Sequence, residues 1–145
     1  TILSEGRGTE RPFQIFGHPD LPKNLFAFTP TSRPGAKDPK LKDQQCYGWD
    51  LGGSDEEVLK EVDGKIQLRW LIEAYQLFPN KDAFFPQPKS GKYEDMWLHK
   101  LVGNDVLMKQ IRDGVSEEEI RRSWQPGLQA FKAIRKKYLL YADFD

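Results

Sequence analysis

The chain has little cysteine, little histidine, no excess of charge of either sign and no long hydrophobic run. Cys46 is the single cysteine among 145 residues, so no internal disulfide can form. His18 and His99 have no metal-ligand spacing to each other or to Cys46, which argues against a zinc site. The 22 basic and 22 acidic residues cancel, whereas a nucleic-acid-binding surface needs a basic excess. No apolar stretch has the length of a transmembrane segment. We therefore expect no metal, no cofactor, no nucleic-acid partner and no membrane span.

Aromatic residues, in contrast, are plentiful. The chain has 4 Trp, 5 Tyr and 9 Phe. Some of them must form the core of a single domain, and the remainder suit a surface that faces a sugar or a partner protein. Trp49 and Asp50 together could bind a sugar, by ring stacking and by hydrogen bonds to hydroxyls, although a core position for Trp49 is the favoured interpretation. Cys46 is interpreted as a small buried hydrophobe rather than as a nucleophile.

The order of secondary structure predicts an α+β fold. Three short extended segments, 13–16, 25–29 and 46–51, lie between turns in the N-terminal third. Segments with helical spacing of apolar residues fill most of the remainder. We expect a small mixed β-sheet from the N-terminal third, packed against several C-terminal helices.

The expected helices have recognisable faces and ends. The first has an apolar face formed by Leu68, Leu71, Ile72, Tyr75 and Phe78. A shorter one is predicted to end at Gly103 and to turn Trp97, Leu98, Leu101 and Val102 inward. Ser116 and Glu119 form a capping box, after which one predicted face carries Ile120, Trp124, Leu128, Phe131 and Ile134. Pro126 must bend this helix or start a new one. The segment 138–141 is either a last helical turn or a closing strand.

The motif Ser4-Glu5-Gly6-Arg7-Gly8-Thr9 is the strongest candidate for a binding site. Glycines on both sides of Arg7 allow the backbone to approach a ligand closely. A guanidinium in such a loop can form a forked pair with a carboxylate or bind a sugar oxygen. Glu5 can contact the ligand or orient Arg7. The alternative interpretation is a flexible leader.

Several blocks in order resemble the C-terminal domain of YbbC-like proteins, which include the NamZ-type exo-β-N-acetylmuramidases. The blocks are 4–9 with Pro12-Phe13 and Phe16-Gly17, then 28–31, then Cys46-x-Gly48, and finally Ile120-x-x-x-Trp124, Leu128-x-x-Phe131, Arg135 and 138–141. The segment 53–64 departs from the family pattern, because it is more acidic and less typical of a strand. The resemblance otherwise spans nearly the whole chain.

The resemblance implies one domain of a bacterial glycosidase that removes N-acetylmuramic acid from peptidoglycan fragments during cell-wall recycling. Residues 1–12 would be an interdomain linker and cleft motif, and residues 13–145 a single α+β domain. A Rossmann-like domain expected upstream would pack against it and hold the catalytic acid, so no catalytic residue is assigned here. Glu5, Arg7 and Thr9 would bind the muropeptide or amino sugar. The parent protein would be secreted or periplasmic, and the chain alone inactive. The alternative function is a non-catalytic module that binds a partner protein or a glycan.

Overall fold

A three-stranded antiparallel sheet forms one end of the molecule. The computed structural model describes residues 1–142, so the last three residues of the predicted domain 13–145 lie outside it. Strand β3 (Cys46–Asp50) lies between β1 (Ile15–His18) and β2 (Phe26–Phe28). Both pairings are antiparallel, with Gly17 opposite Gly48 and Ala27 opposite Tyr47. The α+β class is confirmed, and the expected mixed sheet is corrected to an antiparallel one, since turns and loops, not crossover helices, join these strands.

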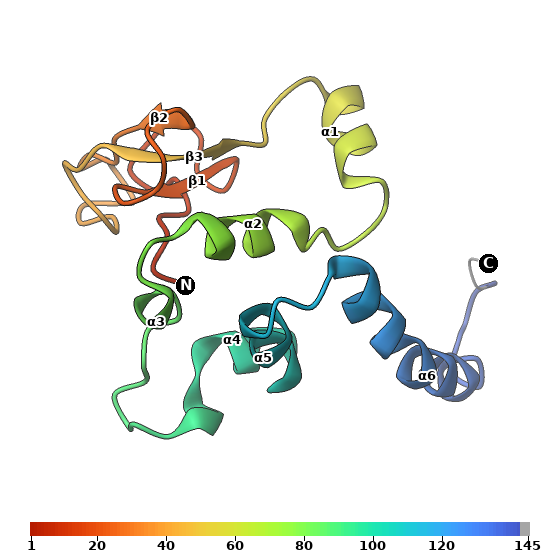
Figure 1. Cartoon of the computed structure of the whole chain (residues 1–145). Helices are drawn as coiled ribbons and strands as arrows, with labels where there is room; N and C mark the ends of the chain where they lie inside the picture. The colour runs from red at the N-terminus through yellow and green to blue at the C-terminus, as the bar shows by residue number, and fades with distance from the viewer. Residues whose placement is uncertain (143–145) are drawn as a thin grey trace.

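Six α-helices and one 3₁₀ turn follow the sheet within the described residues. In chain order these are α1 (Asp55–Val62), α2 (Arg69–Leu77), α3 (Lys81–Phe84), the 3₁₀ turn η1 (Tyr93–Asp95), α4 (Trp97–Val102), α5 (Val106–Arg112) and α6 (Glu117–Arg135). Figure 1 shows α2 running between the sheet and the later helices. None of the helices described has the length and hydrophobicity needed to span a bilayer.

Helices α4 and α6 end and start at the residues that the sequence patterns predict. The predicted capping box of α6 is formed, because Ser116 accepts from the Glu119 amide and the Glu119 carboxylate accepts from the Ser116 amide. A second capping box, of Ser54 and Glu57, starts α1 in the segment that departs from the family pattern. Gly103 ends α4 in the left-handed conformation, as predicted.

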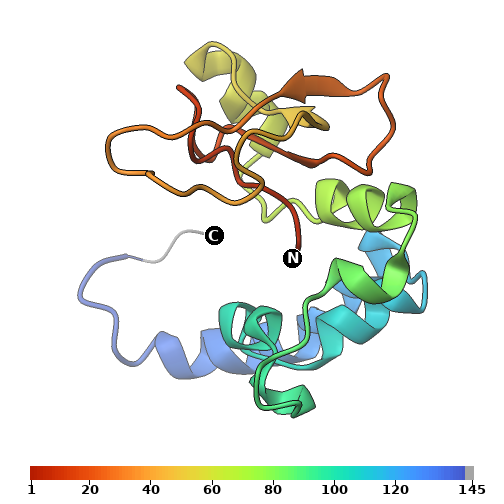
Figure 2. The same ribbon diagram turned by 90° about the vertical axis from the view of Figure 1, so that its left-hand side faces the viewer.

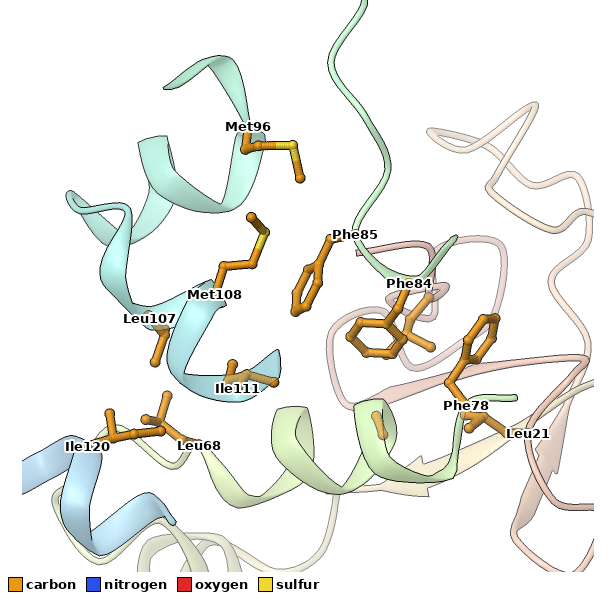
Figure 3. Packing of buried hydrophobic residues seen from close by; sticks show 12 residues of the cluster. Leu21, Leu68, Phe78, Phe84, Phe85, Met96, Leu107, Met108, Ile111 and Ile120 are labelled. Carbon is orange, nitrogen blue, oxygen red and sulfur yellow. The ribbon is translucent and has the colours of Figure 1, made fainter. Parts of the chain in front are cut away.

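The main hydrophobic core lies between α2, the α3 segment and the C-terminal helices. Phe78, Phe84 and Phe85 form a chain of edge-to-face ring contacts with centroids 4.9–5.5 Å apart. Figure 3 shows this aromatic group beside Met108 and Ile111 of α5. The predicted face of α2 is confirmed, since Leu68 and Phe78 are buried and the three residues between them on that face pack against the core.

Two predicted helix faces are wrong. In α4, Leu98 and Val102 are partly buried as expected, but Trp97 and Leu101 are 72% and 80% exposed. This six-residue helix turns His99 inward instead, against the Tyr93 ring. In a helix of six residues only about one turn of side chains can face the core. Trp97 and Leu101 are four residues apart, so they point the same way, and here that direction is toward solvent.

In α6, Ile120 is the only buried residue, and the predicted core face is uncovered beyond Trp124. The helix continues through Pro126 without interruption, and its ribbon bends in Figure 1. Residues 136–141 form turns and irregular chain, so neither a further helical turn nor a closing strand is present there. The later half of α6 therefore adds no layer to the core.

Candidate functional site

The Gly6-Arg7-Gly8 loop is a fixed part of the fold. Both glycines have a positive φ, 77° and 82°. A Cβ on Gly8 would lie 2.5 Å from the Pro39 ring and 2.6 Å from the Thr31 carbonyl oxygen. The Thr31 amide donates to the Gly8 carbonyl oxygen over 2.8 Å. Only glycine satisfies both this backbone conformation and this close packing.

The residues before the loop anchor it to the sheet. Ser4 is buried and exchanges two backbone hydrogen bonds with Gly17 of β1. The Ile2 amide donates to the Phe84 carbonyl oxygen, so the same segment also joins the helical part. A flexible leader does not fit this arrangement. That residues 1–12 form a domain junction stays a prediction.

Arg7 projects from this fixed loop into solvent. Its side chain is 55% exposed, its Nε lies 3.5 Å from a Glu5 carboxylate oxygen, and its guanidinium lies 5.2 Å from the Phe13 ring centroid. Within residues 1–142 the guanidinium donates no hydrogen bond, so its forked face is available to a ligand. Lys40 contacts the other Glu5 oxygen at 3.5 Å. Glu5 thus lies between two cations and holds Arg7 from one side.

Thr9 holds the turn together. Its hydroxyl donates to the Gly6 carbonyl oxygen at 2.6 Å and accepts from the Arg11 amide at 3.1 Å. One further acceptor position remains on that oxygen for a ligand. The structure therefore brings Glu5, Arg7 and Thr9 into one loop, with Arg7 the most accessible of the three.

Phe13 is the residue of this site that sequence analysis missed. It was predicted to start a strand, but it precedes β1 and has a φ of 68°, which is uncommon for a bulky residue. Its ring is 67% exposed although its amide donates to the Glu5 carbonyl oxygen at 2.8 Å. The available signal was its place in the Pro12-Phe13 block. A strained backbone that presents an exposed ring points to a binding role.

An Arg11–Asp50 ion pair joins the segment before Phe13 to the end of β3. The two terminal NH₂ groups of the Arg11 guanidinium donate to the two carboxylate oxygens of Asp50 at the end of β3. Partial burial alone would raise the pKa of Asp50, but the hydrogen bonds from Arg11 and from the Gly52 amide lower it below its usual value. Asp50 therefore stays ionised and engaged, and it is not free for sugar hydroxyls.

A cleft of about 610 Å³ begins beside Phe13. Its walls are the 13–14 segment, the glycines after β3 and helix α1, with Trp70 of α2 opposite. Leu59 and Val62 contribute apolar surface, and Asp55 and Glu61 contribute carboxylates. We call this the α1 cleft. Arg7 does not line this cleft, but its guanidinium lies against the Phe13 ring at the edge of the cleft. This arrangement suits a ligand with a ring and an anionic group.

Trp49 and Asp50 line a smaller cavity that shares Gly52, Glu61 and Trp70 with the α1 cleft, whereas Cys46 lines neither. Trp49 stacks on Phe16 at 4.9 Å and packs against the core, as favoured from the sequence. Cys46 is fully buried in the sheet, and burial raises the pKa of its thiol to about 11, so the thiolate required of a nucleophile is suppressed. No cluster of potential metal ligands occurs among residues 1–142.

Comparison with known proteins identifies the family. Residues 1–141 match the family model described as exo-beta-N-acetylmuramidase NamZ, C-terminal. The chain belongs to the NamZ C-terminal family. The expected resemblance is therefore confirmed over nearly the whole chain.

Two relatives are much longer than this chain. The peptidoglycan beta-N-acetylmuramidase NamZ of Bacillus subtilis (strain 168) is 31% identical over 158 residues, which cover 97% of this chain and 34% of the relative. The crystal structure of a DUF1343 family protein (BF0379) from Bacteroides fragilis NCTC 9343 is 40% identical with a TM-score of 0.81. The alignment covers 99% of this chain and 38% of the Bacteroides fragilis protein. The chain thus spans about a third of the relatives it matches.

Proposed function

We propose that this chain is the cleft-forming, C-terminal domain of an exo-acting β-N-acetylmuramidase of peptidoglycan recycling. Membership of the NamZ C-terminal family supports the reaction class. The observation that carries the role of this domain is Arg7, held by two glycines with its guanidinium exposed.

Arg7 is proposed to bind the lactyl carboxylate of N-acetylmuramic acid. A planar guanidinium can donate two parallel hydrogen bonds to a carboxylate. Its contacts with Glu5 and Phe13 restrict its rotamers before the ligand arrives, which reduces the entropic cost of binding. The lactyl group distinguishes muramic acid from glucosamine, so this contact would provide specificity.

Glu5 and Thr9 are proposed to contact hydroxyl groups of the same sugar. The Glu5 carboxylate is about a third exposed, with a side-chain exposure of 37%, and can accept from a hydroxyl while it orients Arg7. Thr9 can accept one further hydrogen bond, as described above. The Phe13 ring is proposed to stack on the sugar or on its acetamido methyl group at the entrance to the α1 cleft.

The carboxyl groups that hydrolyse the glycosidic bond are proposed to come from a preceding Rossmann-like domain of the same polypeptide. Glycosidases usually need two carboxyl groups that face one bond. Of the two carboxylates that line the α1 cleft, Glu61 is engaged by Arg69, which leaves Asp55 rather than a pair of free carboxyl groups. Binding without a catalytic acid is thus the role we assign to this domain.

Hydrolysis of a chromogenic N-acetylmuraminide tests the proposal. The full-length protein should release the chromophore, whereas the isolated chain should not. A substitution in the α1 cleft of the full-length protein, Phe13→Ala, should weaken turnover. The proposal would be contradicted if the isolated chain hydrolysed the substrate and a substitution within it abolished the reaction. Absence of turnover by the full-length protein would favour the alternative, a module that binds a partner protein or a glycan.

A further inference from the structure

The second half of α6 is an amphipathic helix whose apolar side chains lack a partner among residues 1–142. We call residues 125–135 the α6 arm. Its side chains Leu128, Phe131 and Ile134 are 45%, 60% and 56% exposed. Figure 1 and Figure 2 both show the arm at the end of the molecule away from the β-sheet. Three large apolar side chains on one exposed helix need an explanation.

The uncovered stripe continues the face by which α6 packs on the core. With 3.6 residues per turn, Ile120, Trp124, Leu128, Phe131 and Ile134 fall within about a third of the helix circumference. Ile120 is fully buried and Trp124 packs against the core cluster. The same stripe therefore passes from covered to uncovered along one helix, as it would where the core of one domain extends into an interface with another.

The arm also needs a partner for its own stability. A helix of about ten residues is marginal in water, because few hydrogen bonds offset the cost of nucleation. Pro126 provides no amide to link the arm to the turn before it. Packing of the apolar stripe on another surface would supply the missing stabilisation.

Charge favours a partner other than a second copy. Lys132, Lys136 and Lys137 lie on or directly after the arm and are exposed. Two arms packed in parallel would bring these like charges together, which is unfavourable. A surface with an apolar groove bordered by carboxylates would complement the arm. About two thirds of the length of each relative lies outside the part that aligns with this chain, which leaves ample sequence for such a surface.

We propose that the α6 arm is the docking element for the N-terminal part of the same polypeptide. Leu128, Phe131 and Ile134 insert into an apolar groove of that part, and the lysines pair with carboxylates at its edge. The inference rests on the proposed two-domain protein but does not depend on its muramidase chemistry.

Hydrogen exchange of the full-length protein tests the proposal. The amides of residues 128–135 should exchange at least about a hundred-fold more slowly than those of an unprotected helix end, because the docked arm must detach before its amides can exchange. Phe131→Asp should accelerate their exchange ten-fold or more. Val106→Asp is the matched control, since Val106 is 51% exposed on α5, and it should leave the arm unchanged. Lys132→Glu, a milder change, should accelerate exchange most at low salt.

Three results would overturn the inference. In one, the wild-type arm exchanges without protection in the full-length protein, a measurement that needs no variant. In another, Phe131→Asp and Val106→Asp have the same effect. In the third, protection of the arm rises with protein concentration together with dimer formation in sedimentation, which would assign the surface to a second copy. Loss of muramidase activity with a protected arm would contradict only the proposed function.

Discussion

Replacing Phe13 separates the stability of the fold from the function of the site. The ring is 67% exposed, so its substitution removes only about a third of the contact area of a buried phenylalanine. That third is roughly 50–80 Å², worth about 1–2 kcal/mol of unfolding free energy at 25 cal/mol/Å². Phe13→Ala should therefore destabilise the chain by about 1–2 kcal/mol, below the 3–5 kcal/mol typical of a core phenylalanine.

The comparison with Phe13→Gly isolates the backbone. A φ of 68° costs an L-residue about 1–2 kcal/mol, and glycine avoids this cost but loses about 0.5–1 kcal/mol in chain entropy. Phe13→Gly should thus be more stable than Phe13→Ala by about 0.5–1 kcal/mol. Urea unfolding of the three proteins, with matched m-values, measures both differences.

Replacing Phe13 should also affect the proposed activity of the full-length protein. Both variants should lower kcat/KM for an N-acetylmuraminide by roughly ten-fold, since each would lose the proposed ring stacking and the cation–π support of Arg7. Equal stability of the two variants would show that the Phe13 backbone is not in the left-handed conformation. A loss above about 3 kcal/mol would place the ring in the core, and unchanged kcat/KM would remove Phe13 from the site.

Three further predictions concern other parts of the fold. Ser116→Ala should cost about 1 kcal/mol in a urea melt, because it removes the acceptor for the Glu119 amide at the start of α6; an unchanged midpoint would contradict this. Gly8→Ala should cost about 2 kcal/mol or more, since its methyl group would meet Pro39 and the φ is unfavourable, whereas the open Gly91 provides a matched Gly→Ala control. Burial lowers the pKa of His18, against an opposing effect of Asp20, so the folded state favours the neutral ring. Stability should then fall as the pH drops from 7.5 to 5.5, because the unfolded chain binds the proton first, and His18→Gln should flatten this slope.

The sequence predicted the parts of the fold that depend on local patterns. The capping box at Ser116, the stop at Gly103 and the apolar face of α2 follow from hydrogen-bonding groups and spacing within one helix. The three strands were also located, because turn residues bound them on both sides. The direction of their pairing was missed, since β3 lies between β1 and β2 through contacts that no local pattern specifies.

Predictions that depend on what covers a helix were less successful. Trp97, Leu101 and Phe131 have the spacing of core residues, but periodicity identifies an apolar face without identifying its partner. For the site, the sequence indicated the glycine loop and its Arg7. It did not indicate Phe13 or Trp70, because the α1 cleft is assembled from segments that are distant in the chain.

The most direct test of the central claim compares two substrates with the full-length protein. Arg7→Ala should lower kcat/KM for an N-acetylmuraminide by roughly ten- to a hundred-fold, the equivalent of about 1.5–3 kcal/mol for a charged hydrogen bond. For the matching N-acetylglucosaminide, which lacks the lactyl carboxylate, the same variant should change kcat/KM little. Arg7→Lys should restore only part of the loss, because lysine cannot form the forked pair. If Arg7→Ala impairs both substrates equally, or lowers only the melting temperature, then Arg7 does not bind the carboxylate.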